Sequence, residues 1–373
     1  MAEAPSPELP TSSSDARFAA GIVIPTRFRR IGQAGRKWDL PRSLPGYFAD
    51  PDRQVLGAST KYVVRKTDPK AAQYLIKYAQ KHGKRETLTE FFINQLGTAL
   101  GLKMAHSGLL LADRVPTFVT RIFTGEDETL THGSLMIEDC FKQAEAVDSR
   151  ELDAIPKQTE QSFYTIDFVT EVLQRFCEGD FGEVFPPFIE MLVFDALTGS
   201  MDRHAQNWGV LGTVVKPFRY RFAPIFDSAR ALLWSLSEEQ ISELGPDLGV
   251  DEPATEKSLV PLLRHIDRAR PCIGPLRNHP KVNKCNHFEF IDTLIRLYPI
   301  PVSKAIRKVS NGLGDKSARL MRSFPFRMGF TGRRKRLILR ILNIRMQRLE
   351  NILLRSIAER GTTESVKGME ISV

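Results

Sequence analysis

Two segments hold residue types that could transfer a phosphoryl group. The first is GSMDRHAQNWGVL, residues 199–211, and the second is FAPIFDSAR, residues 222–230. Phosphoryl transfer from ATP needs one carboxylate to orient the attacking hydroxyl and accept its proton, a role that Asp202 suits. It also needs hard oxygen ligands for magnesium, which Asn207 and Asp227 could supply. The D-x-x-x-x-N spacing is that of the protein kinase catalytic loop, but alone it is weak, because Asp202 could equally cap a turn.

The upstream half of the chain supplies the other parts of such a site. Lys77, in YLIKY, lies on a predicted strand among apolar neighbours, where an unpaired ammonium is costly to bury. Glu90 lies on the predicted helix that follows, and a strand lysine paired with a helix glutamate positions ATP phosphates in kinases. Glu86, one helical turn earlier, is a second candidate partner. The alternative is that Lys77 occupies the solvent face of an edge strand.

The elements that must position these residues form two groups. LGASTKYVVRK and AAQYLIKYA predict a hairpin, a helix runs from about Glu86 to Leu100 and stops at Gly101, and GLLLAD and TFVTRIF predict two more strands. After about residue 135 helices dominate, with candidates at Thr165–Cys177 and Pro187–Gly199, and a hairpin is expected within 206–235. The remainder, to about residue 358, is predicted to be mostly helical with breaks at 271–280 and 299–301. A small β-rich lobe before a larger α-rich lobe indicates an α+β, two-lobed protein-kinase-like fold.

These segments resemble the HipA-like serine/threonine kinases over about residues 52–240. FDALTGSMDRHAQNWGVL and FAPIFDSAR are similar to the family's catalytic stretch, VLGASTKYVVR to its phosphate loop, and EFFINQLGTALGLKMA to its helix. MIEDCFKQA, residues 136–144, is similar to its acidic segment after the hinge. The resemblance implies catalytic roles for Asp202, Lys77 and Glu90, and magnesium binding by Asn207 and Asp227. It implies ATP contacts by Gly57, Ala58, Ser59, Thr60, Lys61, Lys77, Thr120, Arg121, Ile122, His204, Asn207, Phe226 and Asp227.

The resemblance also sets expectations about cofactors and partners. ATP and Mg²⁺ are the implied cofactors, and a Ser/Thr of a protein is the implied acceptor, with a translation factor or aminoacyl-tRNA synthetase as one candidate. Ser59 and Thr60 are candidate autophosphorylation sites, and His204 either lies beside the nucleotide or is a packed structural imidazole. A DNA-binding antitoxin is an implied partner, although about 50 residues precede the phosphate loop where long members carry an extra subdomain. The hinge also differs, since Thr120-Arg121 stands where the family often has an acidic residue.

The expected domain limits follow from composition. We expect a disordered tail at 1–15, an N-terminal extension at 16–50, the small lobe at 51–134, the large lobe at 135–326, and a basic C-terminal helix and tail at 327–373. The 373 residues are 42% hydrophobic and 26% charged, which disfavours collagen-like, coiled-coil and wholly disordered classes. Four widely spaced cysteines without a CxxC pair, no secretory signal and no membrane-spanning stretch predict a cytoplasmic protein.

The net charge of +9 is concentrated near the C-terminus. Between Ser303 and Arg348 there are 14 basic residues and one acid, Asp315, so this segment carries +13 and the rest of the chain −4. Within it, residues 333–348 predict a terminal helix packed on the large lobe with its arginines facing solvent. A competing hypothesis is a non-catalytic protein that binds nucleic acid or an anionic surface through residues 327–348. A phosphoinositide-type lipid kinase is the other alternative, disfavoured because Asp227-Ser228-Ala229 replaces the usual Asp-Phe-Gly.

Overall fold

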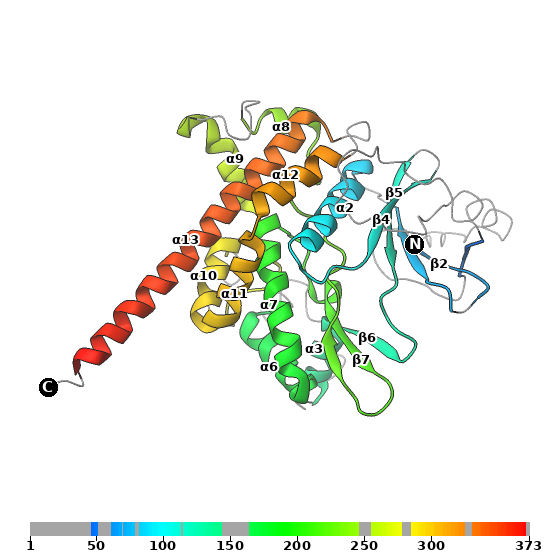
Figure 1. The fold of residues 1–373 in the computed structure, drawn as a ribbon, viewed down its shortest axis with the longest axis horizontal. Coiled ribbons are helices and arrows are strands. Elements are labelled where there is room, and N and C mark those ends of the chain that lie inside the picture. Colours follow the sequence, from blue (N-terminus) through cyan, green and yellow to red (C-terminus); the bar gives the residue numbers. More distant parts are fainter. Residues whose placement is uncertain are drawn as a thin grey trace, which may run out of the picture.

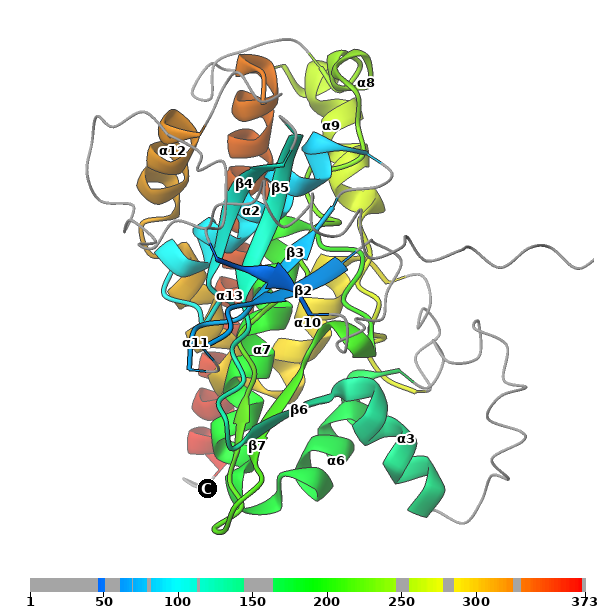
Figure 2. The same cartoon turned by 90° about the vertical axis from the view of Figure 1, so that its right-hand side faces the viewer.

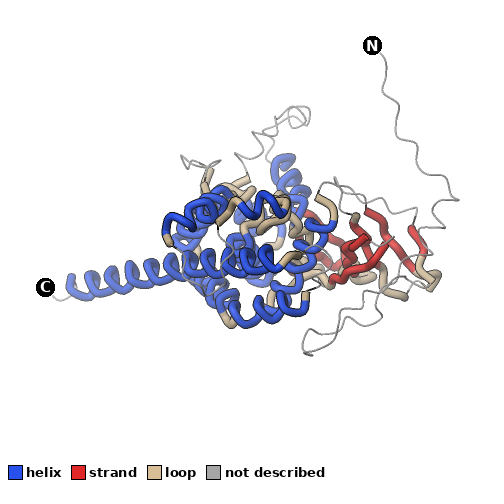
Figure 3. The backbone as a smooth tube through the Cα atoms, turned by 90° about the horizontal axis from the view of Figure 1, so that it is seen from above, coloured by secondary structure: helices blue, strands red, loops and turns tan. Residues whose placement is uncertain are grey.

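The chain divides into a sheet-rich part and a larger helical part, as the sequence predicted. A computed structural model describes residues 46–50, 61–68, 70–78, 82–112, 115–143, 164–245, 255–277, 285–324 and 330–370. The strands gather at one end of the molecule and the helices at the other (Figure 3). The tail at 1–15, most of the extension at 16–50 and the phosphate loop at Gly57–Thr60 lie outside the described residues.

The N-terminal part is a five-stranded antiparallel sheet. Its strands are β1 (Phe48–Ala49), β2 (Lys61–Arg65), β3 (Tyr74–Lys77), β4 (Ser107–Ala112) and β5 (Val115–Arg121), in the order β1-β2-β3-β5-β4. The predicted β2–β3 hairpin is confirmed, and its register places Lys61 opposite Lys77. Residues directly opposite each other project from the same face of a sheet, so the two lysines share one face.

Helix α2 (Lys84–Ala99) packs against β4 and β5 and carries Glu90 (Figure 1). Its apolar side holds Leu88, Phe92 and Leu96, all fully buried. The helix ends as predicted before Gly101, which has φ of +82°, a left-handed conformation that glycine adopts without steric cost.

The large part begins with a second antiparallel sheet, whose middle strand follows the loop that holds Asp202 and Asn207. Strands β6 (Glu128–His132), β7 (Gly209–Thr213) and β8 (Tyr220–Phe222) pair in that order, and the predicted hairpin within 206–235 is β7–β8. Helix α3 (Gly133–Gln143) follows β6, α6 (Ile166–Phe176) follows later in the chain, and a short 3₁₀ turn (Glu178–Asp180) leads into α7 (Phe181–Thr198). Figure 2 shows α3 and α6 at the end of the large part that also holds β6.

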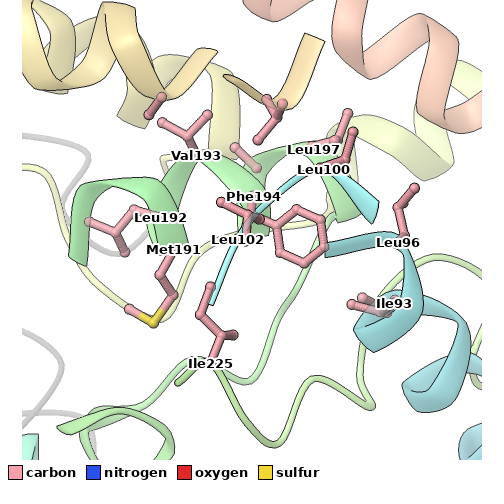
Figure 4. Packing of buried hydrophobic residues seen from close by; sticks show 14 of the residues in the cluster. Ile93, Leu96, Leu100, Leu102, Met191, Leu192, Val193, Phe194, Leu197 and Ile225 are labelled. Carbon is pink, nitrogen blue, oxygen red and sulfur yellow. The ribbon is translucent and has the colours of Figure 1, made fainter. Parts of the chain in front are cut away.

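Helix α7 begins six residues earlier than Pro187, where the sequence placed its start. Pro186 and Pro187 lie inside it and lack the N–H groups that would bond the carbonyls of Gly182 and Glu183. Gly182 and Glu183 are exposed, so water can satisfy those carbonyls, while Val184 and Phe185 are buried and hold the first turns in place. The C-terminal half of α7 packs against α2 and the segment near Ile225 (Figure 4).

Among the described residues, six further helices belong to the large part. They are α8 (Glu238–Ser242), α9 (Glu256–Arg268), α10 (His287–Leu297), α11 (Pro299–Ser310), α12 (Leu313–Ser323) and α13 (Gly332–Glu370). Helix α13 crosses this part and its end projects beyond it (Figures 1 and 3). Ile338, Leu342 and Leu349 of α13 are fully buried in the main hydrophobic core.

The expectation that the arginines of this basic helix face solvent is wrong for two of them. Arg334 and Arg345 are 0% and 1% exposed. Arg345 donates hydrogen bonds to the carbonyls of Ala196 and Ile266, near the C-terminal ends of α7 and α9, whose partial negative charge favours a cation. Arg334 binds Glu238 and two main-chain carbonyls. Part of the excess positive charge is therefore interior structure rather than surface.

Candidate active site

Lys77 is the centre of a buried ion-pair cluster that joins the two parts of the chain. Its Nζ lies 3.0 Å from Glu90 Oε2 on α2 and 2.6 Å from Asp227 Oδ1 in the large part. Its side chain is 8% exposed, so the solvent-facing edge-strand alternative is wrong. Glu90, and not Glu86, is the carboxylate that pairs with Lys77.

Lys61 adds a second ammonium to the same carboxylate. Its Nζ lies 3.4 Å from Asp227 Oδ2. The β2–β3 register explains this, because it places Lys61 directly opposite Lys77 on one face of the sheet. Each oxygen of Asp227 thus faces one lysine.

The charges of this cluster depend on one another. Burial alone would raise the pKa of Asp227, but Lys77 and Lys61 outweigh it and hold the pKa well below its ordinary value. Burial alone would lower the pKa of Lys77, but the Glu90 and Asp227 carboxylates outweigh it and raise the pKa, so the ammonium stays charged. Burial raises the pKa of Glu90 to about 7, against the opposing influence of Lys77.

Asp227 is positioned by its neighbours in the chain. Ile225 forms a parallel bridge with Met104, in which Ile225 N donates to the Lys103 carbonyl at 2.7 Å. This ties the segment to the turn that follows α2. Asp227 itself has φ of +52°, a left-handed conformation that aspartate tolerates better than most residues. The backbone turn aims the carboxylate at the lysines of the sheet.

The expected catalytic loop follows α7, whose last residue, Thr198, is followed by Gly199 in a left-handed conformation. Asn207 closes a 3₁₀ turn, and its Nδ2 donates to the main-chain carbonyl of Asp202 at 2.7 Å. That bond fixes the amide so that its oxygen remains an acceptor for a ligand. His132 of β6 supports the same loop, since its Nδ1 donates to the Gln206 carbonyl at 2.8 Å.

Arg203 is a functional residue that the sequence analysis missed. It is 2% exposed and lies between the catalytic loop and the Asp227 segment. Its guanidinium binds both carboxylate oxygens of Asp195 on α7, at 2.8 and 3.0 Å. It also donates to the Asn207 carbonyl, the Phe226 carbonyl and Ser228 Oγ, at 2.8, 2.7 and 2.9 Å. Arg203 therefore fixes the two expected magnesium-binding segments relative to each other.

The Asp195 carboxylate keeps Arg203 charged. Burial alone would lower the pKa of Arg203, but attraction and hydrogen bonding from Asp195 raise it. The only signal in the sequence was an aspartate on an apolar predicted helix, Asp195, followed eight positions later by Arg203. Spacing alone could not show that they meet.

Asp202, the expected catalytic base, has a partner that the sequence did not predict. Its Oδ1 accepts a hydrogen bond from Arg230 Nη1 at 3.0 Å. Asp202 keeps 22% of its side chain exposed, so a substrate hydroxyl could reach it.

The remaining expected nucleotide contacts surround this cluster less tightly. His204 is exposed, so the packed structural imidazole is wrong. The Phe226 ring lies against Phe123 and His132, with centroids 5.7 and 5.9 Å apart. In the expected hinge, Thr120 to Ile122, the Arg121 amide donates to the His106 carbonyl and the Ile122 amide to Gln73. Both amides therefore donate to carbonyls of neighbouring segments. Contact between adenine and the hinge stays a prediction.

The donor set fits the magnesium that such a site implies. Magnesium prefers hard oxygen ligands and keeps several waters, so one carboxylate and one amide oxygen from the protein suffice. Asp227 is ionised and Asn207 has its amide nitrogen already committed, which leaves oxygen donors on both. Within the described ranges there is no cluster of three or more His, Cys, Asp and Glu that could hold another metal.

An antiparallel sheet over a helical part, with a strand lysine, a helix glutamate and a late aspartate between them, defines a kinase-like fold. The chain belongs to the HipA-like C-terminal domain family, whose model matches residues 54–270. The solved structure of the proinflammatory kinase CtkA from Helicobacter pylori is similar, with a TM-score of 0.61 and 17% identity. That match covers 80% of this chain and 95% of that one.

A second structure contains HipA of Shewanella oneidensis MR-1 in a complex with HipB and operator DNA. It matches with a TM-score of 0.46 and 10% identity, covering 81% of this chain and 66% of that one. At these sequence identities the similarity concerns the fold alone, and it rests on the Helicobacter structure. No curated protein matched the sequence. None of the helices that the structure describes is long and apolar enough to cross a bilayer.

Proposed function

We propose that this chain is an ATP- and Mg²⁺-dependent serine/threonine protein kinase. The observation that supports this proposal most strongly is that four charged side chains from both parts of the chain meet. They are Lys77, Glu90, Lys61 and Asp227. Two ammonium groups beside a metal-ligand carboxylate, with an aspartate and an asparagine on an adjoining loop, match what phosphoryl transfer requires. Family membership supports the same conclusion.

The residues divide the work as follows. Lys77 and Lys61 would bind phosphate oxygens of ATP, and those phosphates would replace Asp227 as their partner. Asp227 and Asn207 would hold magnesium, which when bound neutralises charge on the phosphates. Asp202 would orient a Ser or Thr hydroxyl and accept its proton as that oxygen bonds the γ-phosphorus. The bond from the γ-phosphorus to the β,γ-bridging oxygen breaks, and ADP leaves.

The two alternatives fit the observations less well. A phosphoinositide-type kinase would share this chemistry, but such enzymes usually have Asp-Phe-Gly where this chain has Asp227-Ser228-Ala229. A non-catalytic binding protein using residues 327–348 loses support, because Arg334 and Arg345 are buried and hydrogen-bonded inside the fold. A translation factor or aminoacyl-tRNA synthetase as acceptor, autophosphorylation at Ser59 or Thr60, and an antitoxin-like partner remain predictions from the resemblance.

Phosphoryl transfer with radiolabelled ATP tests the proposal. The wild-type protein is incubated with Mg²⁺ and ATP, alone, with a generic Ser/Thr protein substrate such as casein, and with phosphatidylinositol vesicles. We expect label in protein and none in lipid. Asp202→Asn should lower transfer by about 10²- to 10⁴-fold, the usual contribution of a general base. Asp227→Asn should abolish phosphoryl transfer. Asp292→Asn on α10 is the control and should leave phosphoryl transfer unchanged. Full transfer by either site variant would overturn the proposal.

A further inference from the structure

Arg230 lies three residues after Asp227 and contacts the expected catalytic base. Its Nη1 donates to Asp202 Oδ1 at 3.0 Å, with 36% of the arginine side chain exposed. Many exposed ion pairs contribute nothing measurable, because two long side chains must be held in one geometry. Whether this pair matters therefore depends on what else holds Arg230.

Two contacts hold Arg230 in place, and a third holds the ring over which it lies. The main-chain carbonyl of Arg230 accepts a hydrogen bond from Met201 N at 3.0 Å, directly before Asp202. The guanidinium lies over the ring of Trp234, 5.6 Å from its centroid, an arrangement in which the ring attracts the cation. Trp234 in turn packs edge-on against His82, with ring centroids 4.7 Å apart. The main chain and the side chain of Arg230 are thus each held by a contact of their own.

The anchors connect the base to the small lobe. His82 lies two residues before α2, the helix that carries Glu90. The contact between His82 and Trp234 therefore crosses from the N-terminal part to the segment after Asp227. Through Arg230, the position of the Asp202 carboxylate depends on the same helix that supplies the partner of Lys77.

We propose that Arg230 is a positioning residue for the catalytic base. This rests on the proposed function. Arg230 binds Oδ1 of Asp202 and so fixes the rotation of the carboxylate, and within the described part of the chain no other side chain bonds it. Oδ2 is left to accept the substrate hydroxyl.

The nature of the reaction makes such positioning important. In a loose, metaphosphate-like transition state, catalysis depends mainly on positioning and on electrostatic stabilisation of the transferring group. Orientation of the acceptor hydroxyl therefore matters more than basicity, and a carboxylate held at one oxygen orients it better than a freely rotating one.

The test compares Arg230→Ala and Arg230→Lys with wild type in steady-state phosphorylation of a protein substrate. We expect Arg230→Ala to lower kcat by about 10- to 100-fold, the size of effect that a misplaced catalytic group produces. The KM for ATP and the melting temperature should not change. Arg230→Lys should recover part of kcat, and added methylguanidinium should partly rescue Arg230→Ala. Arg296→Ala, which removes a similar exposed arginine–aspartate pair on α10, is the matched control.

Two results would overturn the inference. An unchanged kcat in Arg230→Ala would show that the pair is an idle surface contact, and a raised kcat would show that Arg230 blocks the base. Asp202→Asn separates this inference from the proposed function. If Asp202→Asn is inactive and Arg230→Ala is fully active, only the positioning role fails. If Asp202→Asn is fully active, the kinase assignment itself fails. The double variant should be no worse than Asp202→Asn, because two residues acting through one group are not additive.

Discussion

Lys77 Nζ lies 2.6 Å from Asp227 Oδ1 and so joins β3 of the small lobe to the segment after β8 across 150 residues of sequence. Glu90 holds the same ammonium from α2 at 3.0 Å. These contacts make one cluster from three elements. Under the proposed function, ATP phosphates would replace Asp227 as the partner of Lys77 and so free the carboxylate for the metal.

Lys77→Met should remove ATP binding and also destabilise the fold. It leaves the buried Glu90 carboxylate without its partner, which costs about 1–3 kcal/mol. Lys77→Met/Glu90→Gln should recover part of that loss without recovering phosphoryl transfer, because the two residues are coupled. Urea unfolding measures the free energies. Lys308→Met, which breaks an ion pair with Glu190 near the surface, should cost no more than about 1 kcal/mol. Additive losses at Lys77 and Glu90 would contradict the coupling.

Glu90 should make stability depend on pH. Its pKa in the folded protein is about 7, above its ordinary value of 4.5, so the folded state retains the proton to higher pH. The stability that this group contributes is fully present below pH 4.5 and is lost as the pH rises through about 7. Wild type should therefore lose stability relative to Glu90→Gln between pH 5.5 and 8.

Glu128→Gln is the control for that comparison. Hydrogen bonds from a main-chain N–H and from Arg221 outweigh the effect of burial and lower the pKa of Glu128 in the wild-type protein. Glu128 therefore titrates below the range from pH 5.5 to 8. The difference between wild type and Glu128→Gln should be constant from pH 5.5 to 8. A constant difference for Glu90→Gln as well would contradict the raised pKa.

Arg203→Met should cost about 3–5 kcal/mol of stability, because it leaves Asp195 as an uncompensated buried charge. Arg203→Lys should lose less stability but still lower kcat, since an ammonium cannot bridge Asp195, Asn207 and Phe226 as the planar guanidinium does. Urea unfolding and steady-state phosphorylation measure the two effects. Arg221→Met breaks a half-exposed pair with Glu128 and should cost under about 1 kcal/mol. Equal losses for the two arginines would show that Arg203 has no special structural role.

Removing residues 327–373 should unfold the protein rather than expose a dispensable surface. Ile338, Leu342 and Leu349 are fully buried, and each large aliphatic side chain lost from a core costs about 2–5 kcal/mol. Their sum reaches the whole stability of an ordinary domain, about 5–15 kcal/mol. A chain ending at Arg360 should keep a cooperative thermal transition, and a chain ending at residue 326 should not. A cooperative transition in the shorter chain would contradict this.

Most of the site was predictable because its residue types are chemically restricted. A lysine in an apolar strand needs a carboxylate, and the strand and helix that carry Lys77 and Glu90 follow from local patterning. The hairpin before the helix, the two strands after it and the stop at Gly101 followed from the same patterns. Asp227 was a candidate from its residue type, and the likeness of the catalytic stretch to a kinase family supported its expected role.

The supporting residues could not be predicted, because their partners are distant in sequence. Arg203 and Arg230 are common surface residue types, and only the packed chain shows that one is buried against Asp195 and the other bound to Asp202. Arg334 and Arg345 looked like a basic surface for the same reason, since main-chain carbonyls at helix ends leave no signal in the sequence. The start of α7 was misplaced because prolines are tolerated in the first turns of a helix where water can satisfy the carbonyls that they leave unbonded.

A crystal structure with a non-hydrolysable ATP analogue and Mn²⁺ in place of Mg²⁺ tests the central claim most directly. Anomalous scattering locates the metal without ambiguity. We predict one nucleotide whose metal is bound by Asn207 Oδ1 and an Asp227 carboxylate oxygen, with Lys77 on a phosphate oxygen and no longer on Asp227. A nucleotide bound elsewhere, with the ion pair between Lys77 and Asp227 intact, would contradict the account.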